Sequence, residues 1–338
     1  MGAYANNHVA TAGYLKNWAG EAERLARVVL DGSGESELKL PSRAGFRRRF
    51  FSDQQVAREA EHRFGVYENE GIAGLERLGR SWPPTDRDRL DIAKLVAVHM
   101  VRNPAFIEAT MKASSTAIRD ELDTYRAHMS DSQADEVIRH LTSEAFRVDY
   151  MLDLVPKQTS LIASMHWTLL EFPVPLLATS DQPVTVVPLL ADGATARVVA
   201  MPPTGFLMTE EIRFALDPWH AVIFTWLNDI DAPRPVLAGD DFAAELNRAV
   251  IAQADREWFH HPGRRATRLK RDDLSFEVCG SLGHQLIPEY STGYAVDSPR
   301  RLHAAKLLNH MIDEQTTGEF HIARVRRVQP SALARIAS

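Results

Sequence analysis

The sequence has a single cysteine, Cys279, among its 338 residues. This lack excludes a disulfide scaffold and any metal site built from several cysteines, and it is compatible with the reducing cytosol. Glycine and proline, at 18 residues each, are too few for a collagen-like or disordered chain. No repeat period is found, which argues against solenoids and propellers. We therefore expect a soluble, cytoplasmic, globular protein.

The sequence also has little that would direct it to a membrane. Residues 1–6 offer neither the basic nor the apolar region of a secretory signal peptide. The most apolar stretch, residues 161–178, contains Glu171, Pro173 and Pro175. A bilayer span would have to bury that charge and would break at those prolines, so no membrane partner is expected.

Several common catalytic motifs are missing as well. The sequence contains no H-E-x-x-H, Walker A, G-x-G-x-x-G, G-x-S-x-G or C-x-x-C pattern. Zinc proteolysis, P-loop NTP hydrolysis, Rossmann redox chemistry and α/β-hydrolase chemistry are therefore disfavoured.

Excess positive charge is absent, because the formal net charge is −6. Proteins that bind duplex DNA by charge alone are usually basic. Local basic clusters nevertheless occur, and they are either solvated faces or parts of a phosphate-binding track, so nucleic acid stays open as a partner. The clusters are Arg43, Arg47, Arg48 and Arg49; Arg264, Arg265, Arg268, Lys270 and Arg271; and Arg324, Arg326 and Arg327.

Apolar periodicity indicates helices at both ends of the chain and strands in the middle. Helices are expected over 12–30, from Ser52 or Asp53 to Leu78 with a break near Gly71, from Thr85 to Pro104, and over 106–125, 131–150, 240–259 and 299–312. Strands are expected over 174–179, 184–187, 197–201, 205–208, 213–216, 221–226 and 319–328. This order predicts an α+β fold, with a helical N-terminal layer packed on a central, mostly antiparallel sheet and with C-terminal helices.

No convincing linker interrupts the chain. We therefore predict one composite domain over residues 1–338, mainly helical over 1–160, mainly β over 161–235, and helical with a final strand over 236–338.

An ordered set of short motifs resembles the DUF4238 family. The motifs are Asn7-His8 followed by Tyr14-Leu15-Lys16-Asn17-Trp18-Ala19, Glu70 with Ala73, Val98-His99-Met100-Val101-Arg102-Asn103-Pro104, Trp167-Thr168-Leu169-Leu170, Ala178-Thr179-Ser180-Asp181-Gln182-Pro183-Val184, Leu216-Asp217-Pro218 and Leu246-Asn247. The family has no settled function, so the resemblance implies candidate positions and no particular reaction.

Asp181 is the strongest single candidate for chemistry. A β-branched run ends at Thr179, and Pro183 restricts Gln182 to extended conformations, which projects Asp181 from a strand end in a fixed direction. A carboxylate there either binds Mg²⁺ and activates water, or accepts backbone N–H bonds two residues on in an Asx-turn.

Two further candidates lie on the predicted helices. Arg102 follows an apolar helix face, and arginine is seldom buried unless it is paired. It either clamps a phosphate or carboxylate, or forms a structural salt bridge to Glu70 or Asp181. Glu68 and Glu70 are about 200° apart on a helix, so only one can face a shared site, and Glu70 is preferred.

A histidine and an amide complete the candidate set. His8 precedes the first helix and is either a proton shuttle or metal ligand, or an incidental surface residue. Asn247, among apolar neighbours on a late helix, either orders another polar residue or is a satisfied buried amide.

The function hypothesis requires these candidates to converge. If His8, Glu70, Arg102, Asp181 and Asn247 share one pocket, they suit a hydrolase or transferase acting on a phosphate-containing substrate, a nucleotide or a nucleic acid. Asp181 and Glu70 would then be the ligands of a divalent metal such as Mg²⁺, if the reaction uses one. The alternative is a non-catalytic binding or interaction protein whose buried polar network is structural. A homodimer stays open, since an exposed helical layer would permit it.

Overall fold

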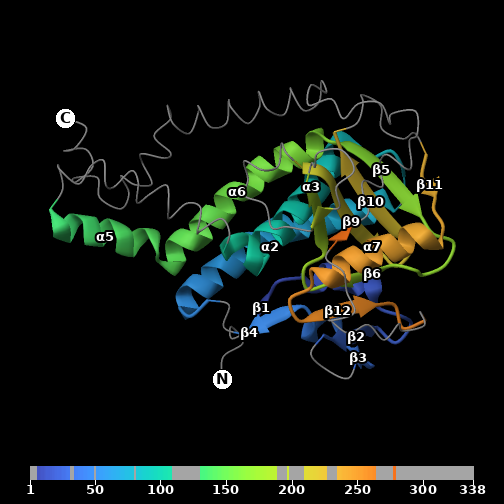
Figure 1. Ribbon diagram of the computed structural model, residues 1–338, viewed down its shortest axis with the longest axis horizontal. Coiled ribbons are helices and arrows are strands. Elements are labelled where there is room, and N and C mark those ends of the chain that lie inside the picture. Colours follow the sequence, from blue (N-terminus) through green and yellow to red (C-terminus); the bar gives the residue numbers. More distant parts are fainter. Residues whose placement is uncertain are drawn as a thin grey trace.

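The computed structural model describes residues 6–30, 34–48, 51–79, 81–108, 130–188, 196–197, 209–226, 234–263 and 277–278. Helices α2, α3 and α6 pack together and lead into a central sheet, while α7 lies over the other end of the molecule near β6 (Figure 1). The arrangement is the predicted α+β fold, with a helical N-terminal layer against an antiparallel sheet.

The two long helices of the helical layer start at the residues predicted from the sequence. Helix α2 spans Gln54–Leu78 without a break, and the Asp53 side chain accepts the backbone N–H groups of Gln55 and Val56. Helix α3 spans Asp86–Val101, and the Thr85 side chain accepts the N–H of Asp88. These side-chain acceptors satisfy N–H groups that have no partner inside the helix.

The predicted helix over 131–150 is two helices. Helix α5 spans Asp131–Leu141, and α6 spans Glu144–Ser164. Ser143 accepts the N–H of Phe146 and so starts a new helix shortly after the first one ends. Helix α6 then packs on α3 and α2.

Two other predicted helices are wrong in part. The segment 12–30 contains only α1 (Ala12–Leu15) and the 3₁₀ helix η2 (Lys16–Trp18), followed by strand β2 (Leu25–Val29). The segment 240–259 contains α7 (Asp240–Ala252) and then strand β12 (Glu257–His260). The reason is tertiary, because β2 and β12 pair with each other although they lie far apart in the sequence.

The central sheet has five strands in the order β11-β5-β10-β9-β7. Every pairing in it is antiparallel except that of β11 with β5, which confirms the mostly antiparallel prediction. The strands are β5 (His166–Glu171), β7 (Val184–Pro188), β9 (Thr209–Asp217), β10 (His220–Thr225) and β11 (Val236–Leu237).

A second sheet has four strands in the order β3-β2-β12-β6, with β3 at Ser36–Lys39 and β6 at Ala178–Ser180. Two short pairs complete the described strands. Strand β1 (Asn6–His8) pairs with β4 (Phe46–Arg48), after the 3₁₀ helix η3 (Pro41–Arg43), and β8 (Ala196–Arg197) pairs with β13 (Glu277–Val278).

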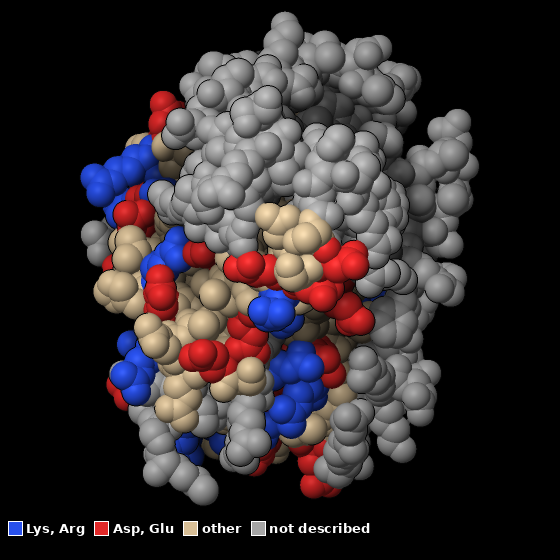
Figure 2. Space-filling model, turned by 90° about the vertical axis from the view of Figure 1, so that its left-hand side faces the viewer, with Lys and Arg blue, Asp and Glu red and all other residues tan. Residues whose placement is uncertain are grey.

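The described surface mixes charges of both signs. On the face seen from the left-hand side of Figure 1, blue and red side chains alternate over the described residues and form no continuous basic track there (Figure 2). Within the part of the chain that the structure describes, none of the helices combines the length and the apolar character needed to span a bilayer.

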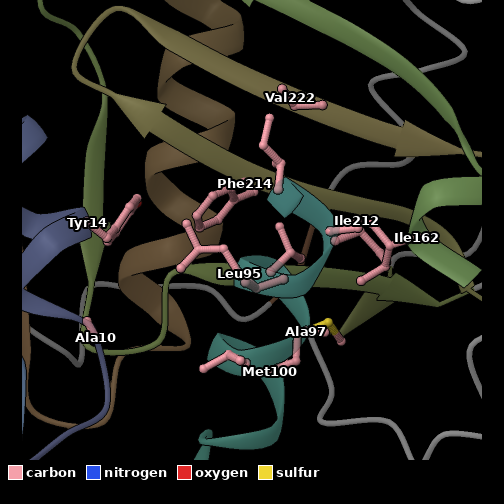
Figure 3. Packing of buried hydrophobic residues seen from close by; sticks show 14 of the residues in the cluster. Ala10, Tyr14, Leu95, Ala97, Met100, Ile162, Ile212, Phe214 and Val222 are labelled. Atoms are coloured by element: carbon pink, nitrogen blue, oxygen red, sulfur yellow. The ribbon is translucent and has the colours of Figure 1, made fainter. Parts of the chain in front are cut away.

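Helix α3 forms the centre of the core. All its residues from Leu95 to Val101 are buried, and its side chains meet Phe214 of β9 and Ile162 of α6 (Figure 3). Helix α2 comes close on the other side because Gly71 has no side chain, and a Cβ there would lie only 2.4 Å from Leu95 Cβ. The core therefore fixes the position of Arg102, the residue that follows α3.

Some predictions lie outside the described residues. These are most of the helix over 106–125, the strand over 205–208, the helix over 299–312, the strand over 319–328, the two C-terminal basic clusters and Cys279. The strand over 197–201 is described only at Arg197, and the division of the chain into three segments stays a prediction.

Candidate functional site

Arg102 lies at the C-cap of α3 and is buried, with only 2% of its side chain exposed. Its Nη2 and Nη1 atoms donate hydrogen bonds to the carboxylates of Glu61 and Glu68, both on α2. The guanidinium carbon also lies 5.0 Å from the centroid of the Phe64 ring, between these two glutamates along the helix. Arg102 is therefore a buried cation held by two carboxylates, in a geometry that joins α2 to α3.

Glu70 does not belong to this arrangement, which corrects the preference for Glu70 over Glu68. Its carboxylate accepts a 2.6 Å hydrogen bond from Lys94 Nζ, and 45% of its side chain is exposed. The structural salt bridge expected for Arg102 exists, but its partners are neither Glu70 nor Asp181. The packing of α2 on α3 turns Glu68 towards Arg102 and Glu70 towards Lys94.

Strand β1 brings Asn7 and His8 to the same region. Asn7 is buried, and its Nδ2 donates to Glu61 Oε1 over 3.2 Å, while its Oδ1 has no hydrogen-bond partner. Burial lowers the pKa of His8, a hydrogen bond with the backbone of Ser42 raises it, and the nearby charges of Glu61 and Arg102 act in opposite directions. The Nε2 atom of His8 is enclosed and has no partner.

His99 adds a second imidazole one turn before Arg102 on α3. Its Nε2 accepts the backbone N–H of Thr11 over 3.4 Å, so in the neutral ring the proton is on Nδ1. Burial, and secondarily the charge of Arg102, lowers the pKa of His99 to about 3. Nδ1 is a buried donor without a partner.

We call this group the N-terminal polar cluster, and its members are Asn7, His8, Glu61, Glu68, His99 and Arg102. It contains one guanidinium, two carboxylates and three buried polar atoms without partners. Asn7, Glu61, Glu68 and His99 were not predicted as site residues. The available signal was the seven-residue spacing of Glu61 and Glu68 around Phe64, which places all three on one helix face.

Asp181 lies elsewhere. Each of its carboxylate oxygens accepts one backbone N–H, from Asp255 and Arg256, at 2.9 Å. These residues form the turn between α7 and β12, so the aspartate ties β6 to that turn. The expected local turn is made instead by Ser180, whose hydroxyl oxygen accepts the N–H of Gln182.

Burial raises the pKa of Asp181 to about 7. The carboxylates of Glu257 and Asp255 add to the rise, while the two N–H bonds oppose it. Glu257 is itself buried and is held by Arg27 and by the N–H of Gly45. Asp181 therefore has structural partners, and these lie on other elements than the residues of the N-terminal polar cluster.

Asn247 is a buried amide with its hydrogen bonds satisfied, which is the second of the two alternatives given for it above. Its Oδ1 accepts the N–H of Ala178 over 2.6 Å, and its Nδ2 donates to the carbonyl of Leu176 over 2.9 Å. Of the five predicted site residues, the structure thus brings together His8 and Arg102, and it places Glu70, Asp181 and Asn247 apart from them.

The proposed metal pair, Asp181 and Glu70, is not a pair in space, since one contacts backbone N–H groups and the other Lys94. Among the described residues, no group of three or more His, Cys, Asp or Glu side chains could hold a metal ion. A bound Mg²⁺ at these two residues does not fit their contacts.

A further polar group lies on one face of the central sheet. His166, Thr225 and Glu211 are neighbours in one cross-strand row, and all three are buried. Arg213 on the same strand as Glu211 contacts both Glu211 and Glu245 of α7. The signal in the sequence is the alternation of polar residues within Thr209–Asp217, from which no site was predicted.

Comparison with known proteins gives a family and nothing closer. The model of a family described as "Protein of unknown function (DUF4238)" matches residues 6–264. No curated protein and no solved structure matches the chain.

Proposed function

The chain belongs to the DUF4238 family of proteins of unknown function, and from its own residues we propose that it is a hydrolase or transferase acting on a phosphate-containing substrate, a nucleotide or a nucleic acid, at the N-terminal polar cluster. The observation that carries the proposal is the imidazole of His8. Its Nε2 atom is enclosed and has no hydrogen-bond partner, beside a carboxylate and a guanidinium.

His8 has the properties of a general base. The lowered pKa keeps the ring neutral at pH 7, so a nitrogen lone pair is available to accept a proton. The hydrogen bond with the backbone of Ser42 engages the other side of the ring and fixes its orientation. Nε2 is then the atom that accepts the proton of an attacking water or hydroxyl group.

The remaining residues of the cluster position this imidazole. Glu61 Oε1 accepts hydrogen bonds from both Asn7 of β1 and Arg102 of α3, so it connects the strand that carries His8 to the helical layer. Both terminal nitrogens of Arg102 are bound by carboxylates, so we assign it the role of a positioning residue in place of the predicted phosphate clamp.

A phosphate would instead meet the basic residues around β4. Arg43 is exposed and follows Ser42, the residue that contacts His8. Arg47 lies opposite Asn7 in the β1–β4 pair, is partly exposed, and contacts Asp255 only at 3.6 Å. Arg43 and Arg47 lie on the segment that pairs with the strand of His8, and guanidiniums suit an anionic substrate.

The proposed step balances without a further reactant. The attacking oxygen forms a bond to phosphorus as its proton moves to His8 Nε2, and the bond between phosphorus and the leaving oxygen breaks. The leaving oxygen then takes the proton back from the imidazolium, which restores the neutral ring. With water as the nucleophile the reaction is hydrolysis, and with an alcohol it is transfer.

The test is a screen of the full chain with bis(p-nitrophenyl) phosphate, nucleoside triphosphates and RNA. His8→Gln should lower kcat by about 100-fold or more on the substrate that turns over, because general base catalysis contributes that much. His62→Gln, an exposed histidine on α2, is the matched control and should keep the wild-type rate. A His8→Gln rate equal to that of the wild type, or no turnover by the wild type on any of these substrates, would contradict the proposal.

One observation favours the interaction protein as a second candidate. Arg102, Asp181 and Asn247 all have their hydrogen bonds satisfied by protein groups, as in a structural network. If this is their whole role, Asp181→Ala should lower the melting temperature by several degrees, and the chain should turn over none of the substrates in the screen.

A further inference from the structure

The hairpin between β9 and β10 carries an aspartate–histidine pair that the proposed function does not use. His220 Nδ1 lies 3.0 Å from Oδ1 and 2.9 Å from Oδ2 of Asp217. Asp217 Oδ1 also accepts the backbone N–H groups of Trp219 and His220, over 2.7 and 2.8 Å. The backbone N–H groups of the turn thus fix the carboxylate of Asp217, and this carboxylate fixes the imidazole of His220.

This geometry sets the tautomer of His220. Since Nδ1–H donates to Asp217, the lone pair of the neutral ring is on Nε2. No hydrogen bond of Nε2 is found within the described part of the chain, and 37% of the side chain is exposed, so solvent reaches the ring. A carboxylate that holds Nδ1–H while Nε2 accepts a proton is the arrangement of the base in hydrolytic triads.

The charges around the pair are negative. The hydrogen bond to Asp217 raises the pKa of His220, burial lowers it, and the charges of Asp217 and of Glu171, its cross-strand neighbour on β5, raise it further. Two carboxylates beside one imidazole repel an anionic substrate. The site therefore suits a neutral electrophile, which distinguishes it from the N-terminal polar cluster.

An aromatic residue, Trp219, lies in the same turn, between Asp217 and His220. Trp219 is partly exposed, and its ring lies 5.3 Å from that of His261 at an angle of 58°. Asn17 Nδ2 donates to the carbonyl of Leu216, the residue before Asp217, and so holds the start of the turn. The partly exposed ring of Trp219 offers a planar group a stacking surface in the same turn as the imidazole.

We propose that the tip of the β9–β10 hairpin is a second catalytic site, which hydrolyses neutral aryl esters with His220 as the general base and Trp219 as the stacking surface. Water forms a bond to the ester carbonyl carbon while its proton moves to His220 Nε2. The tetrahedral intermediate collapses, the bond to the aryl oxygen breaks, and the phenol leaves with the proton that His220 returns. Asp217 is a positioning residue that stabilises the imidazolium.

The experiment uses the full chain and p-nitrophenyl acetate as the probe. His220→Gln should lower kcat/KM by about tenfold or more relative to the wild type. Trp219→Leu should raise KM several-fold while kcat changes by less than about twofold, because it removes only binding. His62→Gln, in an exposed histidine outside both sites, should leave all values unchanged.

Asp217→Asn provides a readout that a merely structural role of the aspartate would not move. It should shift the pH midpoint of kcat/KM downwards, since the carboxylate raises the pKa of the base. A loss of less than about tenfold in His220→Gln, or an unchanged midpoint in Asp217→Asn, would overturn the proposal. Neither outcome bears on His8, because its test uses phosphate substrates.

Discussion

Arg102 and Glu68 meet across the packed faces of α3 and α2, and the guanidinium of this ion pair is only 2% exposed. A second carboxylate, Glu61, completes its hydrogen bonds. Removal of one partner from a buried ion pair leaves an uncompensated charge, whereas an exposed pair adds little to stability. The helical layer therefore depends on Arg102 much more than on its surface ion pairs.

Arg102→Met tests this dependence. We expect a loss of about 3–5 kcal/mol in the free energy of unfolding, because the partly buried carboxylates of Glu61 and Glu68 lose the cation between them. Urea denaturation at pH 7 measures the loss.

The control for Arg102→Met is Lys94→Met on the same helix. Lys94 pairs with the half-exposed Glu70 and with Asp91, which keeps Arg77 as a partner. The control should cost less than about 1 kcal/mol. Equal losses in the two variants would show that the burial of Arg102 adds nothing to its ion pairs.

Gly71→Ala should loosen the same interface by a different mechanism. A Cβ at Gly71 would lie 2.4 Å from Leu95 Cβ, so α2 and α3 would have to move apart, at a cost of about 1–3 kcal/mol. Gly65→Ala, six residues earlier on α2, meets no atom within 4 Å and should instead stabilise the protein by about 0.5–1 kcal/mol. Thermal unfolding of both variants measures the two effects. A shift of the melting temperature in the same direction in both would contradict this packing of α2 on α3.

The buried Asp181 should make stability depend on pH. Its folded pKa of about 7 lies above its ordinary value of 3.8, so the folded state holds its proton more tightly than the unfolded state. The stability that this group contributes is complete below about pH 4 and is lost as the pH rises to about 7. Asp181→Asn removes the titration, so the wild type should lose stability relative to this variant across that window.

His99 acts in the opposite direction over an overlapping range. Its pKa of about 3 in the folded state lies below 6.5, so its contribution is present above pH 6.5 and is lost as the pH falls. The difference between wild type and Asp181→Asn cancels this effect, because both proteins contain His99. A difference that stays constant from about pH 4 to about pH 7 would mean that the two N–H bonds to Asp181 outweigh its burial.

Local signals in the sequence predicted the parts of the fold that depend on neighbouring residues. Helix starts were predicted at Ser52 or Asp53 and at Thr85, and the side chains of Asp53 and Thr85 accept N–H groups two or three residues on. In the central sheet, β7, β9 and β10 overlap strands that were predicted from short apolar runs rich in β-branched residues, whereas β5 and β11 were not predicted as strands.

Pairing over long distances could not be predicted in this way. Leu25–Val29 has helical spacing of its apolar residues, yet it is a strand because Glu257–His260 pairs with it. The sequence showed that Glu68 and Glu70 point to different sides of their helix. Which of them faces the site depends on how α2 packs on α3. Asp181 was expected to be at a strand end, and its partners come from residues 255 and 256, which no local pattern indicates.

The proposed function depends above all on His8, which must accept a proton during turnover of a phosphate substrate. The pH dependence of kcat/KM for bis(p-nitrophenyl) phosphate, measured with the wild type and His8→Gln, tests this directly. We expect the wild-type rate to fall as the pH decreases through a midpoint below 6.5, the ordinary pKa of histidine, and the variant to show neither the rate nor the midpoint. An identical profile in both proteins would contradict the role of His8 as the base.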